Sequence, residues 1–290
     1  MNESDWERLL KQLHRGDCTP LLGAGACFGR LPIGAELCRH FADQYEYPFA
    51  DRNVLHRVMQ YAAFIRDDPV EFKIEVCEYL KGESRQSLPA KLDPHSTIAE
   101  FPIKTLITTN YDNFMVEALR RAQGGYKSPV ALTARWWELG TTPTDLDVPT
   151  AEKPLVYHLH GNWDEPRSLV LTEDDYIAYM VNMLHRGDYS QASPLPFPVL
   201  DAMLNRPLLF IGYSLQDWNF WVLFRGLLRA ISDTQRRRHI SVQLLPDLDM
   251  SVAEAEVKAK KYLERYLDRW HISIYIGSAD DFFGELRNKM

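Results

Sequence analysis

Paired cysteines are absent from this sequence. Its four cysteines are Cys18, Cys27, Cys38 and Cys77, and no two of them have the C-x-x-C spacing. Zinc ribbons and redox-active dithiols depend on that spacing, so neither is expected. Each cysteine lies in an apolar or helix-like stretch, which predicts reduced thiols packed in the core and no bound zinc or other metal.

Long apolar runs are also absent. No segment approaches the roughly 20 apolar residues that a membrane helix requires, so no membrane partner is expected. The first residues, Met1 to Asp5, contain neither the basic leader nor the apolar segment of a signal peptide. The default expectation is therefore a cytoplasmic protein.

A surplus of basic residues is missing as well. Lysine and arginine number 33 and the acidic residues 40, which gives a formal net charge of −7. Proteins that bind nucleic acid generally carry a basic surplus, so no direct binding to nucleic acid is expected. The one basic run, Arg236 to Arg238, is interpreted as a solvated turn. An anionic cofactor stays compatible with this charge, because a few N–H groups can bind a pyrophosphate locally.

Short apolar runs alternate with helix-like segments along the chain. The 290 residues, 46% of them hydrophobic, are enough to bury a full core. Strands alternating with helices predict an α/β fold, a Rossmann-like and mostly parallel sheet with helices on both faces. We expect a single domain over residues 1–290. The expected strands cover 19–22, 104–108, 155–158, 207–211, 240–244 and 271–276.

The first expected strand runs into a glycine turn, Gly23-Ala24-Gly25-Ala26. Glycines allow backbone torsions and close approaches that a Cβ would block. Such a turn can direct backbone N–H groups toward one point, which suits the phosphates of a dinucleotide. The next glycine is Gly29, one position later than in the dehydrogenase pattern, so the turn alone is equally compatible with a plain strand–helix connection.

A helical block separates the first two expected strands. Val54, Val58 and Ile65 belong to one apolar stripe, and Val70 and Ile74 belong to a second. We therefore predict a helical insertion at about 48–100, placed over the ligand cleft.

Polar residues follow three later strands, in the runs Thr109-Asn110-Tyr111-Asp112, His160-Gly161 and Gly212-Tyr213-Ser214. The carboxyl ends of parallel strands meet at one edge of a sheet, and ligands bind outside that edge. We therefore expect these residues to lie beside the glycine turn.

Taken in order, the four stretches resemble the sirtuin superfamily, and within it the SIR2-like branch found in bacterial anti-phage systems. The resemblance runs from about Thr19 to the end of the sequence. Two features depart from the protein-deacylating sirtuins: the cysteine pairs of their zinc ribbon are missing, and Leu31-Pro32-Ile33-Gly34 replaces their Asp-Phe-Arg run. The resemblance therefore implies a member that consumes NAD, hydrolysing it to nicotinamide and ADP-ribose.

The resemblance also implies roles for individual residues. Asn110 would orient the nicotinamide ribose and the attacking water, Asp112 would bond the nicotinamide carboxamide, and His160 would act as a base. The residues alone also allow a plainer reading, in which Asn110 and Asp112 form an Asx turn at the end of a strand. His160 could equally be a buried histidine bonded to the backbone, a reading that we prefer for His158.

The remaining motif positions would hold the cofactor. Ser214 and Asp217 match the place where the family binds the adenosine ribose, and an ordinary helix N-cap is an equal alternative for them. The full set expected to bind NAD is Gly23, Ala24, Gly25, Ala26, Thr109, Tyr111, Gly161, Gly212, Ser214 and Asp217.

An NAD-consuming enzyme would need restraint. The sequence shows no fused sensor or ATPase, so we expect self-assembly into a homo-oligomer and a separate protein regulator, for which a HerA-type ATPase is one candidate by family analogy. Two other functions stay open: an NAD-dependent protein deacylase, and a non-enzymatic sensor of NAD or ADP-ribose.

Overall fold

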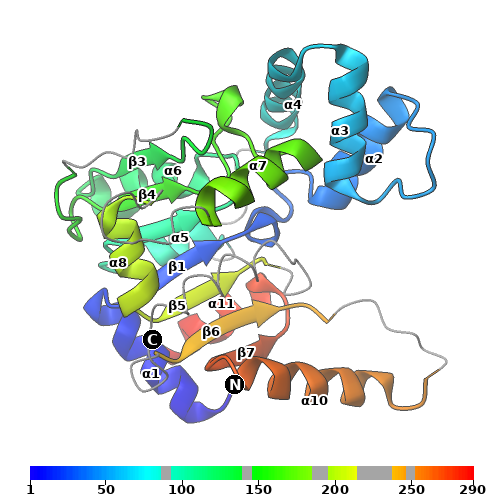
Figure 1. Ribbon diagram of the computed structural model, residues 1–290. Helices are drawn as coiled ribbons and strands as arrows, with labels where there is room; N and C mark the ends of the chain where they lie inside the picture. Colours follow the sequence, from blue (N-terminus) through cyan, green and yellow to red (C-terminus); the bar gives the residue numbers. More distant parts are fainter. Residues whose placement is uncertain (86–92, 139–145, 185–194, 214–236, 246–251) are drawn as a thin grey trace.

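Seven strands in the described part of the chain form one parallel sheet, in the order β3-β4-β2-β1-β5-β6-β7 (Figure 1). The computed structural model describes residues 1–85, 93–138, 146–184, 195–213, 237–245 and 252–290. The predicted α/β fold with a parallel sheet is confirmed. The strands are β1 Thr19–Leu22, β2 Thr105–Thr108, β3 Val130–Thr133, β4 Leu155–His158, β5 Leu208–Ile211, β6 His239–Gln243 and β7 Ile272–Ile276.

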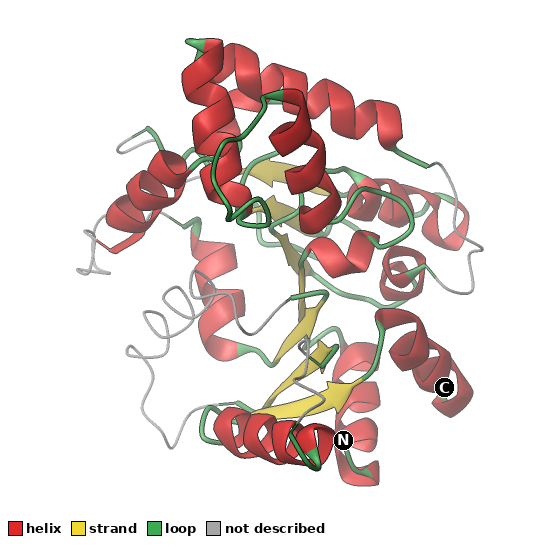
Figure 2. Ribbon diagram, turned by 90° about the vertical axis from the view of Figure 1, so that its right-hand side faces the viewer, coloured by secondary structure: helices red, strands yellow, loops and turns green. Residues whose placement is uncertain are grey.

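Helices cover both faces of the sheet (Figure 2). The apolar side chains of each strand alternate between the two faces, as the period of two requires. Leu22 and Leu106 pack on one face, and their neighbours Leu21 and Ile107 pack on the other. The first face contacts α1 Glu3–Arg15, α5 Pro94–Ala99, α6 Phe114–Arg121 and α11 Ala279–Lys289. The second face contacts α7 Glu173–Leu184, α8 Phe197–Asn205 and α10 Ala255–Asp268.

The strand order reverses at β1, which lies between β2 and β5. Leu22, the last residue of β1, is paired with Thr108 of β2 and with Ile211 of β5. The residues that follow these strands therefore leave the sheet side by side. Ligands of open parallel sheets bind in the crevice at such a reversal.

A helical layer extends beyond this edge of the sheet and has a core of its own. It consists of α2 Gly34–Gln44, α3 Leu55–Arg66 and α4 Pro69–Glu83, which stand apart at the upper right of Figure 1. Phe41 and Phe72 are fully buried in this core, which also includes Trp163 from the segment that follows β4. The helical insertion after β1 is confirmed, while the bounds 48–100 and the single-domain division of residues 1–290 stay predictions.

One buried ion pair joins the helical layer to α7. Lys73 Nζ of α4 lies 2.7 Å from Asp175 Oδ1, with side-chain exposures of 7% and 12%. The other carboxylate oxygen of Asp175 accepts hydrogen bonds from the backbone N–H groups of Leu171 and Thr172. Removing the lysine would leave a buried carboxylate without its cation.

Lys73→Met is expected to lower the free energy of unfolding by about 3 kcal/mol, because breaking a buried pair strands its partner charge. The matched control is Lys81→Met on the same helix, whose pair with Asp164 is exposed at 45% and 63%. That control should cost less than about 1 kcal/mol. Urea unfolding of both variants measures the difference, and equal costs would contradict the prediction.

Strand β3 and helix α8 were not predicted from the sequence. Strand β3 is a half-exposed edge strand, so its pattern carries little apolar signal. Helix α8 begins at Phe197 and has a proline in its first turn, where the missing N–H costs nothing.

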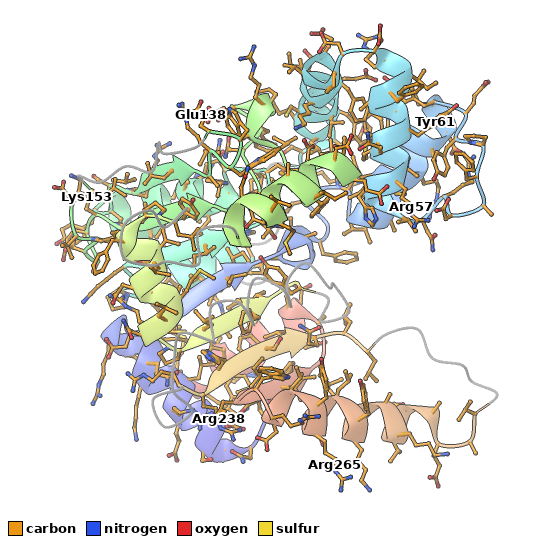
Figure 3. The ribbon with its side chains drawn as sticks, viewed as in Figure 1. Arg57, Tyr61, Glu138, Lys153, Arg238 and Arg265 are labelled. Atoms are coloured by element: carbon orange, nitrogen blue, oxygen red, sulfur yellow. The ribbon has the colours of Figure 1, made fainter. Side chains whose placement is uncertain are left out.

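The predicted solvated turn at the arginine run is described only in part, because Arg236 lies outside the described residues. Arg238, labelled in Figure 3, donates to Asp268 at 2.8 Å and to Ser273 at 3.2 Å. This arginine therefore ties the start of β6 to α10 and β7. Across the described ranges, no helix combines the length and apolar character needed to cross a membrane.

Candidate active site

The glycine turn brings the backbone of β1 against the backbone that follows β5. A Cβ on Gly23 would lie 2.7 Å from the carbonyl oxygen of Gly212, and one on Gly25 would lie 2.8 Å from the Cα of Gly212. Gly212 itself has a φ of +72°, a conformation that favours glycine. Glycine is thus required at all three positions for this contact, and the turn forms a short 3₁₀ helix, Ala24–Cys27.

The N–H groups of the turn differ from the sequence-based expectation. Gly23 N–H donates to Ile211 O, Gly25 N–H to Gly212 O and Ala26 N–H to Gly23 O, at 2.9, 3.0 and 2.9 Å. These three N–H groups donate to backbone carbonyls of the protein, so they are not available to a phosphate. The close approach of two backbones, rather than a ring of free donors, explains the glycines.

Asn110 has its side chain fixed by two hydrogen bonds. Its Nδ2 donates to Gly23 O at 3.0 Å and to Cys27 Sγ at 3.1 Å. Because a carbonyl can only accept, the bond to Gly23 determines which end of the amide carries the nitrogen. Among the described residues no donor bonds the Oδ1 atom, so this oxygen can accept from a ligand or a water. The Asx-turn alternative does not describe this side chain.

Asp112 forms an Asx turn before α6, as the plainer reading expected, and it has a second contact. Its Oδ1 accepts from Phe114 N–H at 2.8 Å, at the start of α6. Its Oδ2 accepts from the thiol of Cys27 at 3.1 Å. Burial, and then the Asp112 carboxylate, raise the pKa of Cys27 well above the usual thiol value, so this cysteine is a hydrogen-bond donor at neutral pH.

His160 lies against two tyrosines of α7. The ring centroids of Tyr176 and Tyr179 are 5.8 and 5.1 Å away, both edge-on. Burial among these rings lowers the pKa of His160 to about 4, so the imidazole is neutral at physiological pH. His158 is the more deeply buried histidine, as predicted, with its Nδ1 3.4 Å from Asn110 O.

The low pKa of His160 predicts a loss of stability in acid. The folded pKa of about 4 lies below the ordinary value of 6.5, so between these values the unfolded chain binds a proton that the folded chain does not. The free energy of unfolding should therefore fall as the pH drops from 6.5 to 4, by about 3 kcal/mol from this residue. Burial also lowers the pKa values of His158 and His239, which adds to the slope.

The variant His160→Phe isolates the share of this residue, because phenylalanine preserves the edge-on ring contacts. Denaturant unfolding at pH 7 and pH 4.5 should show a smaller acid-induced loss for the variant than for the wild type. The same loss in both proteins would mean that His160 does not titrate as described.

One cavity of about 330 Å³ unites these groups. Asn110, Asp112 and His160 all contribute to its wall, beside the glycine turn. Leu37, Leu55 and Leu80 of the helical layer, together with Tyr176 and Tyr179, supply an apolar cover. The predicted residues that line it are Gly23, Ala24, Thr109, Asn110, Tyr111, Asp112, His160 and Gly212.

Thr109 and Tyr111 are fixed by hydrogen bonds of their own. Thr109 Oγ1 accepts from the Tyr213 hydroxyl at 2.9 Å, and the Tyr111 hydroxyl donates to Val170 O at 2.8 Å. Gly161 is not among the residues named for this cavity; its φ is +99° and a Cβ there would meet the Ser168–Leu169 backbone. Ser214 and Asp217 lie outside the described residues.

A second cavity of about 570 Å³ adjoins the first and shares Gly212 and Tyr213 with it. Gly25 and Ala26 line this cavity instead of the first. Its other wall follows the ends of β6 and β7, where Gln243 and Ser278 lie. Sequence reasoning missed these two residues, although Gln243 is at the end of a predicted strand and Ser278 follows another, so the same edge rule would have found them.

Comparison with known proteins found a matching family model and several similar sequences. A family model described as a SIR2-like domain matches residues 104–275. The NAD(+) hydrolase ThsA of Enterococcus faecium is 29% identical over 142 residues, 49% of this chain and 26% of that protein. Its namesake from Bacillus cereus (strain MSX-D12) is 30% identical over 185 residues, 63% of this chain and 35% of that protein. The namesake from Cytobacillus dafuensis is 23% identical over 235 residues, 80% of this chain and 42% of that protein. The chain therefore spans less than half the length of these relatives.

Proposed function

We propose that this chain, which belongs to the SIR2-like domain family, is an NAD⁺ hydrolase that cleaves the bond between nicotinamide and ribose. The single observation that carries the proposal is that Asn110 and His160 line one cavity beside the glycine turn. The relatives that carry the name NAD(+) hydrolase support the choice of substrate.

The chemistry of this bond suits the groups in the cavity. Nicotinamide in NAD is a cationic pyridinium and leaves as a neutral molecule, so its departure needs no general acid. The reacting carbon gains positive charge, as in glycoside hydrolysis generally. Asn110 Oδ1, fixed by the two bonds of its Nδ2, accepts from the attacking water or a ribose hydroxyl. The apolar cover from the helical layer limits competing water.

His160 acts here as a neutral acceptor. With a pKa of about 4 it is a weak base at rest, so its first task is to accept a hydrogen bond from a ribose hydroxyl or water. That hydroxyl becomes more acidic as the neighbouring carbon gains positive charge, and the imidazole can then take the proton. Tyr176 and Tyr179 keep the ring in position through their edge contacts.

The two adjoining cavities suggest how the dinucleotide lies. The nicotinamide ribose occupies the first cavity, where Asp112 can accept a hydrogen bond from the carboxamide through a free lone pair. The adenosine half extends into the second cavity, past Gly212 and Tyr213. In this proposal Gly23 to Ala26 support the diphosphate by shape, and Gly161, Ser214 and Asp217 remain predicted contacts.

The biological role follows from the family resemblance: a NAD-depleting effector in cytoplasmic anti-phage defence. Depletion of NAD would arrest the infected cell, so the activity must be switched. We propose that a homo-oligomer and a separate regulator, with a HerA-type ATPase as one candidate, provide the switch.

The test is direct. The purified chain is incubated with NAD, alone and with a candidate regulator, and the products are separated by chromatography. Equal amounts of nicotinamide and ADP-ribose are expected. NAD left intact in both arms would overturn the proposal, and intact NAD with measurable binding would point to the sensor. Release of O-acyl-ADP-ribose from an acylated peptide would point to the deacylase.

A further inference from the structure

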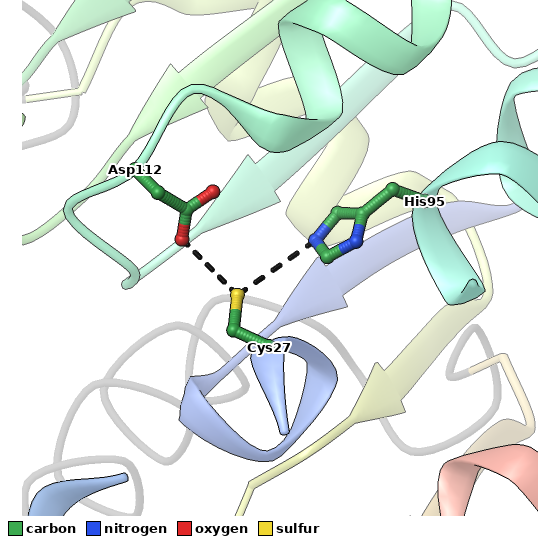
Figure 4. A group of neighbouring side chains, drawn as sticks. All are labelled: Cys27, His95 and Asp112. Carbon is green, nitrogen blue, oxygen red and sulfur yellow. Dashed lines mark hydrogen bonds between the residues drawn. The ribbon is translucent and has the colours of Figure 1, made fainter. Parts of the chain in front are cut away.

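Three side chains from separate parts of the chain meet beneath the first cavity. They are Cys27 from the glycine turn, His95 from α5 and Asp112 after β2 (Figure 4). Cys27 Sγ lies 3.1 Å from Asp112 Oδ2 and 3.9 Å from His95 Nε2, and the three atoms are all within 4.8 Å of one another. All three side chains are buried.

These atoms have the spacing of metal ligands. Zinc binds thiolate sulfur at about 2.3 Å and imidazole nitrogen or carboxylate oxygen at about 2.0–2.2 Å. At a tetrahedral angle, such ligand atoms are about 3.5 Å apart. The observed separations of 3.1 and 3.9 Å lie on either side of that value, so small side-chain movements would complete the geometry.

The histidine is oriented as metal-binding histidines are. His95 Nδ1 lies 3.0 Å from Asp93 Oδ1, which leaves Nε2 directed at Cys27. Ligating histidines usually donate their second ring N–H to a carboxylate in this way. Asn110 Nδ2 donates to Cys27 Sγ at 3.1 Å, a contact that would also support a thiolate.

The charges around the cluster favour a cation. Arg30 lies 3.6 Å from Asp93 and its guanidinium stacks 3.5 Å above the Phe114 ring. The carboxylates of Asp93 and Asp112 share this buried region with the Arg30 guanidinium. Two carboxylates and a thiol that can lose its proton are groups that attract a divalent ion. Within the described part of the chain, Arg30 forms its ion pair with Asp93 and none with the three ligand atoms.

We propose that Cys27, His95 and Asp112 bind one divalent ion of the zinc class. On binding, the Cys27 thiol loses its proton to solvent and a metal–sulfur bond forms. Cys27 and Asp112 also line the first cavity, so the fourth coordination position opens toward the ligand. This site is unrelated to a cysteine-pair ribbon, whose absence gave the expectation of no zinc.

A functional consequence follows, and it rests on the proposed function. The ion binds Asp112, and it also binds Cys27, whose sulfur accepts a hydrogen bond from Asn110. Asp112 and Asn110 are the two side chains assigned to the nicotinamide end of NAD. Zinc occupancy therefore inhibits NAD cleavage.

Cobalt titration of the chelator-treated chain, residues 1–290, tests the site. The wild type should bind one Co²⁺ with a thiolate charge-transfer band and tetrahedral d–d bands, and Zn²⁺ should abolish both. Cys27→Ser should lose the charge-transfer band, and Asp93→Asn should weaken binding about 10–100-fold. Cys38→Ser is the matched control, because Cys38 is also a buried thiol but lies in the helical layer.

Circular dichroism and thermal unfolding without metal establish that each variant is folded. The absence of the bands from the wild type, or their persistence in folded Cys27→Ser, would overturn the proposal. The spectra are recorded without NAD, so they decide the metal site even if NAD is never cleaved. For the inhibition, Zn²⁺ should suppress the wild type, and the remaining activity of His95→Ala should be insensitive to it. Equal sensitivity of both proteins would overturn that consequence.

Discussion

Asn110→Ala is expected to lower kcat for NAD cleavage about 10²–10³-fold, the usual loss when one preorganised polar group of a reacting centre is removed. The amide is preorganised because Gly23 O and Cys27 Sγ hold both of its N–H donors. Its oxygen therefore meets the substrate without reorientation. KM should change much less, because apolar groups supply most of the cavity wall.

Initial rates of nicotinamide release at several NAD concentrations measure both constants. Asn205→Ala is the matched control, since this exposed amide on α8 donates to Asp201 on the same helix and, among the described residues, to no other group. It should match the wild type. Thermal unfolding of Asn110→Ala establishes that the fold persists, and a folded variant within tenfold of the wild-type kcat would remove Asn110 from the mechanism.

Gly212→Ala is expected to lower the free energy of unfolding by about 4 kcal/mol, through left-handed backbone strain and overpacking together. The new Cβ would lie 2.6 Å from the carbonyl carbon of Gly25, and closer still to the amide nitrogen of Ala26. Both neighbours are backbone, so neither can rotate away. The melting temperature should fall by about 10 °C, and the glycine turn should be displaced.

Gly82→Ala is the matched control for this substitution. Gly82 is in α4, and a Cβ there meets nothing within 4 Å. In a helix the same change should stabilise the protein by about 1 kcal/mol. Calorimetry of the two variants should therefore give shifts of opposite sign, and a Gly212→Ala variant as stable as the wild type would show that the two backbones can separate.

The sheet was predictable because its strands are buried on both faces and read as unbroken apolar runs. Leu208–Ile211 is such a run, with every residue buried. Strand β3 could not be predicted in this way, since Val130–Thr133 lies at the edge of the sheet and none of its residues is fully buried. The helical layer was predictable because apolar residues in α3 and α4 recur at helical spacing. That α2 packs in the same core was not, because tertiary packing leaves no local pattern in the sequence.

The site was predictable as far as strand ends determine it. Asn110 and His160 each follow a central strand, so parallel topology brings them to one cavity. The role of Cys27 was missed, because a cysteine in an apolar stretch looks like core and its partner His95 is far away in sequence. The hydrogen bonds that the N–H groups of the glycine turn donate within the protein were also missed. They depend on the close approach of the Gly212 backbone, which the sequence does not reveal.

The pair between Lys73 and Asp175 has a mechanical consequence. Asp175 is adjacent to Tyr176, whose ring meets His160 edge-on, and Gln60 of α3 exchanges hydrogen bonds with Asp174 at 2.8 and 3.0 Å. The first turn of α7 is thus clamped by α3 and by α4. A displacement of either helix would therefore move the first turn of α7, and through Tyr176 it would move the imidazole of His160. The position of this ring thus depends on helices that lie outside the sheet.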